Sequence, residues 1–201
     1  ERERLNALYA LLGKGLDAEL VYAYLLRTVD ALPEGAWSEP SLLPHWTRAH
    51  VVAHLVLNAE GLTGVLRGLV RDEPTPMYPS QERRDADIAE VAGRSPSELR
   101  TRLLAATTHF ADAVAALPEE RWGDAFERTP GGPRFHAGSV PGMRLREVEI
   151  HHADLGLDYS REDWPSEFTT LLVEVLSRRL EVPVLLRADD PGETWRSAAD
   201  A

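Results

Sequence analysis

Cysteine is absent from the 201 residues of the sequence. Its absence excludes a disulfide framework, a metal site with thiolate ligands and a nucleophilic thiol of the protein's own. Any sulfur chemistry therefore requires a thiol brought in from outside. Seven histidines and 33 acidic residues are present instead. If the chain forms a metal site, that site has to be built from imidazoles and carboxylates.

Positive charge is also scarce. The chain carries 22 Lys and Arg against 33 Asp and Glu, which gives a formal net charge of −11. This balance repels phosphate backbones and anionic headgroups, so nucleic acid and membranes are not expected partners. We find neither an uninterrupted apolar run long enough to span a bilayer nor a leader-like start. We therefore expect a cytoplasmic protein, whose 43% hydrophobic content is enough for an ordinary core.

Apolar residues recur at helical spacing in four main segments. The first covers residues 2–32, and the second begins at Thr47, whose hydroxyl can cap it; we expect these two helices to pack as antiparallel partners. The string "SPSE" at 95–98 is a capping box that predicts a third helix to about residue 117. A fourth runs from Pro141 to Asp154, and Gly156 is placed to end it. Long loops follow the second and third helices, with a short helix over 81–91 in the first loop.

The C-terminal segment changes character. The string "DWPSEFTTLLVEVLSRRL" predicts a fifth helix, with Asp163 as its cap and Pro165 inside it. The string "VPVLLRADDPGETW" then predicts two strands around a turn at 189–192. A lone hairpin is marginal in water, so this one either packs on the helices or belongs to a sheet that the chain does not complete. The sequence thus predicts a mainly α fold, with a four-helix bundle over 1–158 and a small α/β part over 159–201.

Two carboxylates and two imidazoles crowd into "REVEIHHADLG", residues 146–156 of the fourth helix. Glu147 and His151 are four positions apart and share one face of that helix. Glu149 and His152 fall roughly on the opposite face. Because charged residues mostly lie outside, we expect Glu149 and His152 to face water. The crowded stretch therefore does not predict a site that uses all four side chains.

The second helix contributes the string "HVVAH". His54 lies within its apolar stripe, whereas His50 lies near the helix start, where we expect it to meet solvent. A catalytic zinc site needs three N or O ligands and one open position, and His54 with the Glu-x-x-x-His pair of the fourth helix could supply the three. A structural cluster of buried, mutually hydrogen-bonded polar groups fits the same spacing. Spacing alone leaves both interpretations open.

Two strings, "LLPHWTRAHVVAHLVLNAEGL" and "RLREVEIHHADLG", are specific when they occur together, and "TPMYPSQERR" lies between them. With them the chain resembles the mycothiol-dependent maleylpyruvate isomerase family of the DinB-like superfamily, over about residues 38–157. The resemblance implies a DinB-like four-helix bundle with a smaller α/β C-terminal domain. It also implies a divalent metal, usually zinc, held by His54, Glu147 and His151.

The resemblance implies a reaction as well. Mycothiol, a cysteine-containing pseudodisaccharide thiol, would supply the sulfur that the chain lacks. Its thiolate, formed at the metal, would add to the cis double bond of maleylpyruvate; rotation and loss of the thiolate would give fumarylpyruvate, a step of gentisate-type aromatic catabolism. The substrate carries two carboxylates, so positive charge has to gather at the pocket. The candidates are Arg83, Arg84, Arg144 and Arg146, although for each of them a surface or ion-paired position is the more common one for an arginine.

Asp154 could orient His151 as a carboxylate behind the metal ligand, or could bond to nearby backbone at the helix end. For Asn58 and Trp46 we expect packing and orientation rather than catalysis. Two further functions stay open. One is a mycothiol S-transferase that acts on another electrophile, and the other is a non-catalytic bundle that binds a metal, a small ligand or a protein partner.

Overall fold

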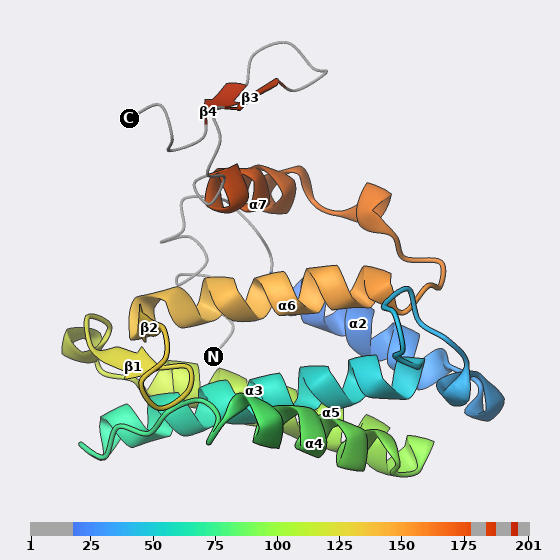
Figure 1. Ribbon diagram of the computed structural model, residues 1–201, viewed down its shortest axis with the longest axis horizontal. Helices are drawn as coiled ribbons and strands as arrows, with labels where there is room; N and C mark the ends of the chain where they lie inside the picture. Colours follow the sequence, from blue (N-terminus) through green and yellow to red (C-terminus); the bar gives the residue numbers. More distant parts are fainter. Residues whose placement is uncertain (1–17, 178–183, 188–193, 197–201) are drawn as a thin grey trace. The chain divides into compact units, whose positions relative to one another are not determined.

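The computed structural model describes residues 18–177, 184–187 and 194–196. The chain divides into two compact units, residues 1–162 and 163–201. The first unit contains α2 (Ala18–Ala31), α3 (Arg48–Val70), α4 (Gln81–Ala92), α5 (Pro96–Ala116) and α6 (Val140–Asp154), with a hairpin of β1 (Ala125–Glu127) and β2 (Arg134–His136) (Figure 1). The mainly α prediction is confirmed. The first half of the expected N-terminal helix, residues 2–17, lies outside the described residues.

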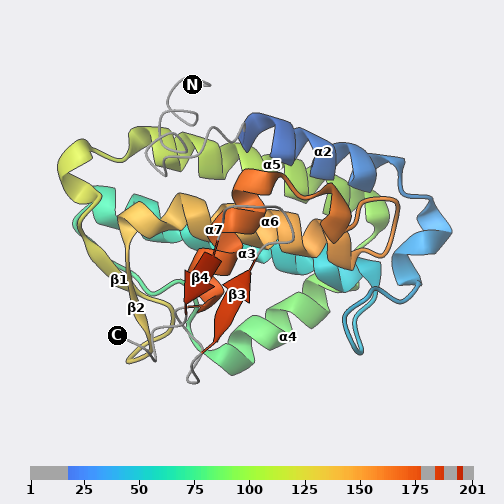
Figure 2. The same cartoon turned by 90° about the horizontal axis from the view of Figure 1, so that it is seen from above.

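Helices α2, α3, α5 and α6 form the predicted bundle. Helix α3 packs against α5 and α6, and α2 packs against the same two helices (Figures 1 and 2). The main neighbours of α2 are thus α5 and α6, so the prediction that the first two helices are partners is wrong. A short 3-10 helix, Glu34–Ser38, lies in the connection between them. Helix α4 packs on α3 outside the ring of four.

Helix α3 is the central helix of the first unit. It begins after Thr47, as predicted: the Thr47 Oγ1 accepts from the His50 backbone N at 3.4 Å, and the His50 Nδ1 accepts from the Thr47 backbone N at 3.3 Å. Among the described residues, α3 is long and apolar enough by composition to cross a membrane, but 72% of its most apolar window is buried inside the protein. Packing in the bundle core therefore accounts for its apolar length.

The other helix ends follow the predicted capping chemistry. Ser95 Oγ accepts from the backbone N of Glu98 at 3.3 Å, and Glu98 Oε2 accepts from the backbone N of Ser95 at 3.0 Å, which is the expected capping box. Gly156 has a φ of +65°, in the left-handed region that a residue just past a helix end commonly adopts. Helix α6 therefore ends where its sequence predicts.

The β1–β2 hairpin was not predicted, because the sequence between the third and fourth helices was expected to be a loop. Its strands pair antiparallel, with Phe126 opposite Phe135. Three residues per strand are too few to show alternation in a sequence. The backbone N of Met77 donates to the Glu127 O, and the backbone N of Tyr78 donates to the Arg128 O, each at 2.9 Å. The hairpin therefore fixes the end of the loop that connects α3 to α4.

The second unit contains α7 (Ser166–Ser177), β3 (Leu185–Arg187) and β4 (Thr194–Arg196). The strands pair antiparallel with Leu186 opposite Trp195, so the predicted C-terminal hairpin is confirmed. Pro165 precedes α7 instead of lying inside it, which corrects the predicted start. The Pro165 O accepts from the backbone N of Thr169 at 3.0 Å, the first bond of the helix, and a proline is tolerated there because no helical N–H is lost.

Candidate metal centre

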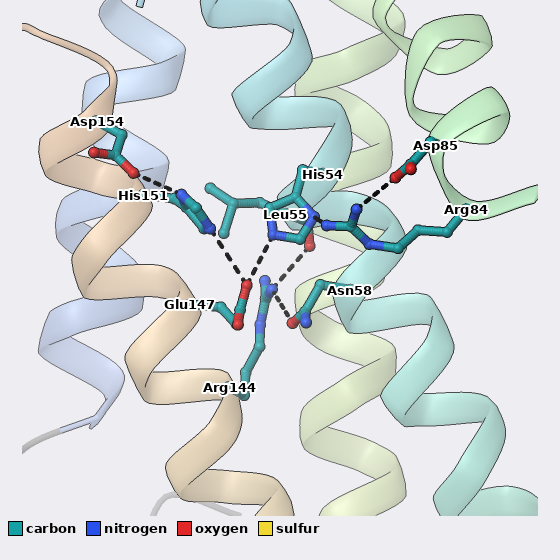
Figure 3. Close-up of polar contacts among 9 residues, drawn as sticks. All are labelled: His54, Leu55, Asn58, Arg84, Asp85, Arg144, Glu147, His151 and Asp154. Carbon is teal, nitrogen blue, oxygen red and sulfur yellow. Dashed lines mark hydrogen bonds and ion pairs between the residues drawn. The ribbon is translucent and has the colours of Figure 1, made fainter. Parts of the chain in front are cut away.

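Three side chains from two helices converge at the α3–α6 contact (Figure 3). The Nε2 of His54 on α3 lies 2.8 Å from the Oε2 of Glu147 on α6, and the Nε2 of His151, one turn further along α6, lies 3.4 Å from the same oxygen. One ligand atom from each residue lies within 4.8 Å of the other two. The four-residue spacing on α6 and the packing of α6 on α3 together produce this cluster.

The three groups hold one another in distinct charge states. Burial lowers the pKa of His54, although its hydrogen bond to Glu147 acts in the opposite direction. Burial alone would raise the pKa of Glu147, but hydrogen bonds with His151 and His54 hold it far below its ordinary value. Burial would lower the pKa of His151, but the Asp154 and Glu147 carboxylates outweigh it and raise that pKa to about 9. At neutral pH the cluster therefore contains a neutral imidazole, a carboxylate and an imidazolium.

Asp154 orients His151. The His151 Nδ1 lies 2.8 Å from the Asp154 Oδ2, so the contact expected from the sequence is present. With its Nδ1–H directed to this carboxylate, the ring presents its Nε2 to the cluster. The rings of His54 and His151 meet edge to face, with centroids 4.6 Å apart. The His151 imidazole is thus held both by its hydrogen bond to Asp154 and by its packing against the His54 ring.

His54 has different surroundings. Its Nδ1 lies 3.2 Å from an Nη of Arg84, which comes from α4 (Figure 3). The Trp46 ring packs edge-on against His54, with centroids 5.7 Å apart, and also lies 6.3 Å from the His50 ring. The expected orienting contact of Trp46 is therefore present. His50 is half-buried and bonds to Thr47 at the helix start, so it is less exposed than predicted.

The donor set fits a divalent metal. Two imidazoles and one ionised carboxylate are the kind of ligands found in catalytic zinc sites, which keep a fourth position open. A structural hydrogen-bonded cluster has the same contacts between the three side chains. The carboxylate behind His151 is the additional feature found in metal sites, where an outer partner of this type orients the ligand. The arrangement can therefore hold a zinc ion through His54, Glu147 and His151.

The four candidate arginines occupy different surroundings. Arg83 is exposed on α4, where it forms an ion pair with Asp87. Arg84, the next residue, has only 15% of its side chain exposed and contacts His54. Arg146 is half-buried. It directly precedes Glu147 in the sequence, so its side chain leaves α6 on a different face from that of Glu147. Of the arginines on α4, Arg84 is the one in contact with the cluster.

Arg144 is fully buried. One Nη donates to the Leu55 O at 2.8 Å and to the Asn58 Oδ1 at 2.9 Å, both on α3 (Figure 3). The side chain therefore ties α6 to α3 beside the cluster and has no exposed surface with which to meet a substrate carboxylate. The buried position of Arg144 is inconsistent with the substrate contact expected for it. The hydrogen bond of Asn58 to Arg144 is consistent with the orienting role expected for Asn58.

Glu149 and His152 do not face water, which corrects the prediction made from the helical wheel. Each is only 1% exposed. The Tyr159 hydroxyl donates to Glu149, the Tyr159 ring stacks on His152 at 3.9 Å, and the His152 Nε2 lies 2.8 Å from the Thr28 Oγ1. Burial raises the pKa of Glu149. The prediction failed because α2 and the chain after α6 cover this face, so α6 is buried on two sides.

Tyr78 was missed as a neighbour of the cluster. The centre of its buried ring lies 5.8 Å from the guanidinium carbon of Arg84 and 5.5 Å from that of Arg128. A Cβ at Gly61 of α3 would lie 3.0 Å from the Met77 O, so the loop before Tyr78 lies almost against that helix. The string "TPMY" marked this loop in the sequence, but nothing in it indicates which residues its tyrosine contacts.

Comparisons with known proteins identify a family and two similar crystal structures. The profile of the mycothiol maleylpyruvate isomerase N-terminal domain matches residues 18–156. Two crystal structures, of the mycothiol-dependent maleylpyruvate isomerase and of a histidine-to-alanine mutant of it, are similar to this chain with a TM-score of 0.76 and 29% sequence identity. Each match covers 88% of this chain and 69% of the other. No sequence among the curated proteins matches.

Proposed function

This chain belongs to the mycothiol maleylpyruvate isomerase N-terminal domain family, and we propose that it is a metal-dependent enzyme that uses mycothiol to convert maleylpyruvate into fumarylpyruvate. The convergence of His54, Glu147 and His151 on one point is the observation that carries the proposal. The similarity to a maleylpyruvate isomerase of known structure supports the choice of reaction. The proposed substrate is a small dicarboxylate, and the proposed location is the cytoplasm.

In this proposal zinc is the metal, and His54, Glu147 and His151 are its ligands. A zinc ion there would lower the pKa of a thiol at its open position, so that the mycothiol sulfur is nucleophilic at neutral pH. Glu147 supplies a carboxylate that is already ionised, because the two imidazoles hold its pKa low. Once His151 has given up one of its two protons, Asp154 keeps the remaining proton on Nδ1, so that Nε2 can act as a ligand.

Arg84 is the residue best placed to bind a carboxylate of the substrate. Its guanidinium contacts His54 at 3.2 Å and is partly accessible, whereas Arg144 is buried and used by α3. A fixed cation beside the cluster offsets the net charge of −11, which would otherwise repel a dicarboxylate. The same cation stabilises negative charge that develops when a nucleophile adds to the double bond of the substrate. Arg83 and Arg146 remain candidates for the second carboxylate.

Turnover by the purified chain tests the proposal. With zinc, mycothiol and maleylpyruvate present, the cis vinyl proton signals in NMR spectra should be replaced by those of the trans isomer, while the thiol concentration stays constant. His54→Ala should abolish turnover, and His109→Ala, which changes an exposed histidine of α5, should not. Stoichiometric loss of thiol would instead indicate an S-transferase. Absence of turnover by the zinc-loaded chain would contradict the proposed activity and favour a non-catalytic bundle.

A further inference from the structure

The two histidines of the cluster have opposite outer partners. His151 directs its Nδ1 to the carboxylate of Asp154, at 2.8 Å, and a carboxylate accepts hydrogen bonds. His54 directs its Nδ1 to the guanidinium of Arg84, at 3.2 Å, and a guanidinium can only donate. The Nδ1 of His54 must therefore be the acceptor in this contact. An imidazole whose Nδ1 accepts a hydrogen bond carries its proton on Nε2, and the Nε2 of His54 donates to the Glu147 Oε2 at 2.8 Å (Figure 3).

A metal would require the opposite arrangement at His54. The Nε2 faces Glu147 and the cluster, so the metal would take the lone pair of that nitrogen. In a neutral imidazole the proton then has to be on Nδ1. The Nδ1–H would point at an N–H of Arg84, and two donors 3.2 Å apart repel each other. Resting on the proposed metal site, we propose that metal binding at His54 and the Arg84–His54 hydrogen bond are mutually exclusive, so that metal loading releases the Arg84 guanidinium.

The exchange is balanced in protons. One proton leaves Nε2 as the metal binds, and one joins Nδ1 from solvent, so the net charge of His54 does not change. The released guanidinium has little freedom to move away. Its other Nη lies 2.7 Å from the Asp85 Oδ1, and its carbon lies 5.8 Å from the centre of the Tyr78 ring. Tyr78 is itself fixed by its backbone bond to Arg128.

Metal loading would therefore free one Nη of Arg84, next to His54, to bind an anion. In the metal-free state the same Nη is engaged by His54, so a carboxylate would have to compete for it. The site would bind an anionic substrate well only after it has acquired its metal. By reciprocity, an anion on Arg84 should also favour binding of the metal.

The affinity for zinc tests the exclusion without any measurement of turnover. Arg84→Met removes the competing donor, and Arg83→Met removes an equal charge from the neighbouring, exposed position. In competition with a fluorescent chelator, we expect Arg84→Met to bind zinc about tenfold more tightly than Arg83→Met, which corresponds to about 1.4 kcal/mol, a size typical of hydrogen bonds to charged groups. Equal affinities of the two variants, or weaker binding by Arg84→Met, would overturn the proposal.

The position of the proton gives a second test. Long-range 15N–1H spectra of the wild-type protein should show His54 protonated on Nε2 without metal and on Nδ1 with zinc bound. A metal-free spectrum with the proton on Nδ1, or an identical tautomer in both states, would overturn the proposal. Neither readout involves maleylpyruvate. If zinc affinity and the tautomer of His54 change as expected but no isomerase activity is found, only the proposed function is contradicted. If the enzyme is active but Arg84→Met and Arg83→Met bind zinc with equal affinity, only this inference is contradicted.

Discussion

Binding of zinc to the metal-free protein at pH 7.5 should release about one proton, and the structure identifies its source. With a pKa raised to about 9, His151 is mainly an imidazolium at this pH. Glu147 is already ionised and His54 is already neutral, because their pKa values are lowered. His151 is therefore the ligand that must lose a proton before it can bind the metal.

The pH dependence of zinc affinity follows from the same values. A group whose pKa is raised stays protonated until the pH passes that pKa, so the proton competes with the metal below pH 9 and not above it. The apparent affinity should rise by nearly tenfold per pH unit from pH 7 until the pH approaches 9 and then level off, which makes it about 25-fold higher at pH 9.5 than at pH 7.5. Asp154→Asn should lower the pKa of His151 and reduce the proton release at pH 7.5.

Isothermal titration calorimetry measures this release directly. Zinc binding is recorded at pH 7.5 in several buffers with different ionisation enthalpies, and the slope of the observed enthalpy against the ionisation enthalpy gives the number of protons. His109→Ala should give the same slope as the wild-type protein. Tight binding with a slope near zero at pH 7.5, or an affinity that does not change up to pH 9, would refute the assignment of charge states to the cluster.

Four substitutions test the packing around the site by urea unfolding. Gly61→Ala should destabilise the chain by about 1–3 kcal/mol, because the new Cβ would lie 3.0 Å from a backbone oxygen. Gly64→Ala on the same helix is the matched control: its Cβ would have no neighbouring atom within 4 Å, so it should stabilise the chain by up to about 1 kcal/mol. Arg144→Met should cost about 2 kcal/mol, since it breaks the charged hydrogen bonds between α6 and α3. Tyr159→Phe should cost about 1–3 kcal/mol, because the buried Glu149 loses a donor, and no change in unfolding midpoint would contradict that contact.

Sequence reasoning was most successful where a local rule determines the structure. The capping box at Ser95 and the stop at Gly156 depend on a few consecutive residues, and both helix ends were located correctly. The pairing of Glu147 with His151 follows from helical spacing in the same way. The choice of His54 as the third member also agreed with the structure, because its neighbours on the helix are apolar and buried.

The predictions failed where a partner distant in sequence determines the outcome. Whether Glu149 and His152 are exposed depends on Thr28 of another helix and on Tyr159 beyond the helix end, which no wheel can show. The contact of Arg84 with His54 depends on where α4 packs. The pairing of the first two helices was wrong for the same reason, since a connection of this length permits either neighbour.

The sequence separation within the cluster bears on the order of events during synthesis. His54 and Glu147 are 93 positions apart, so their contact closes a long loop, and such contacts tend to form late in folding. Before α6 docks on α3, the chain has only the Glu147–His151 pair, which supplies fewer ligands than a structural zinc site requires. A nascent chain should therefore remain metal-free until the bundle is complete. Zinc would be acquired by a protein that is already folded, in contrast to small domains that the ion itself folds.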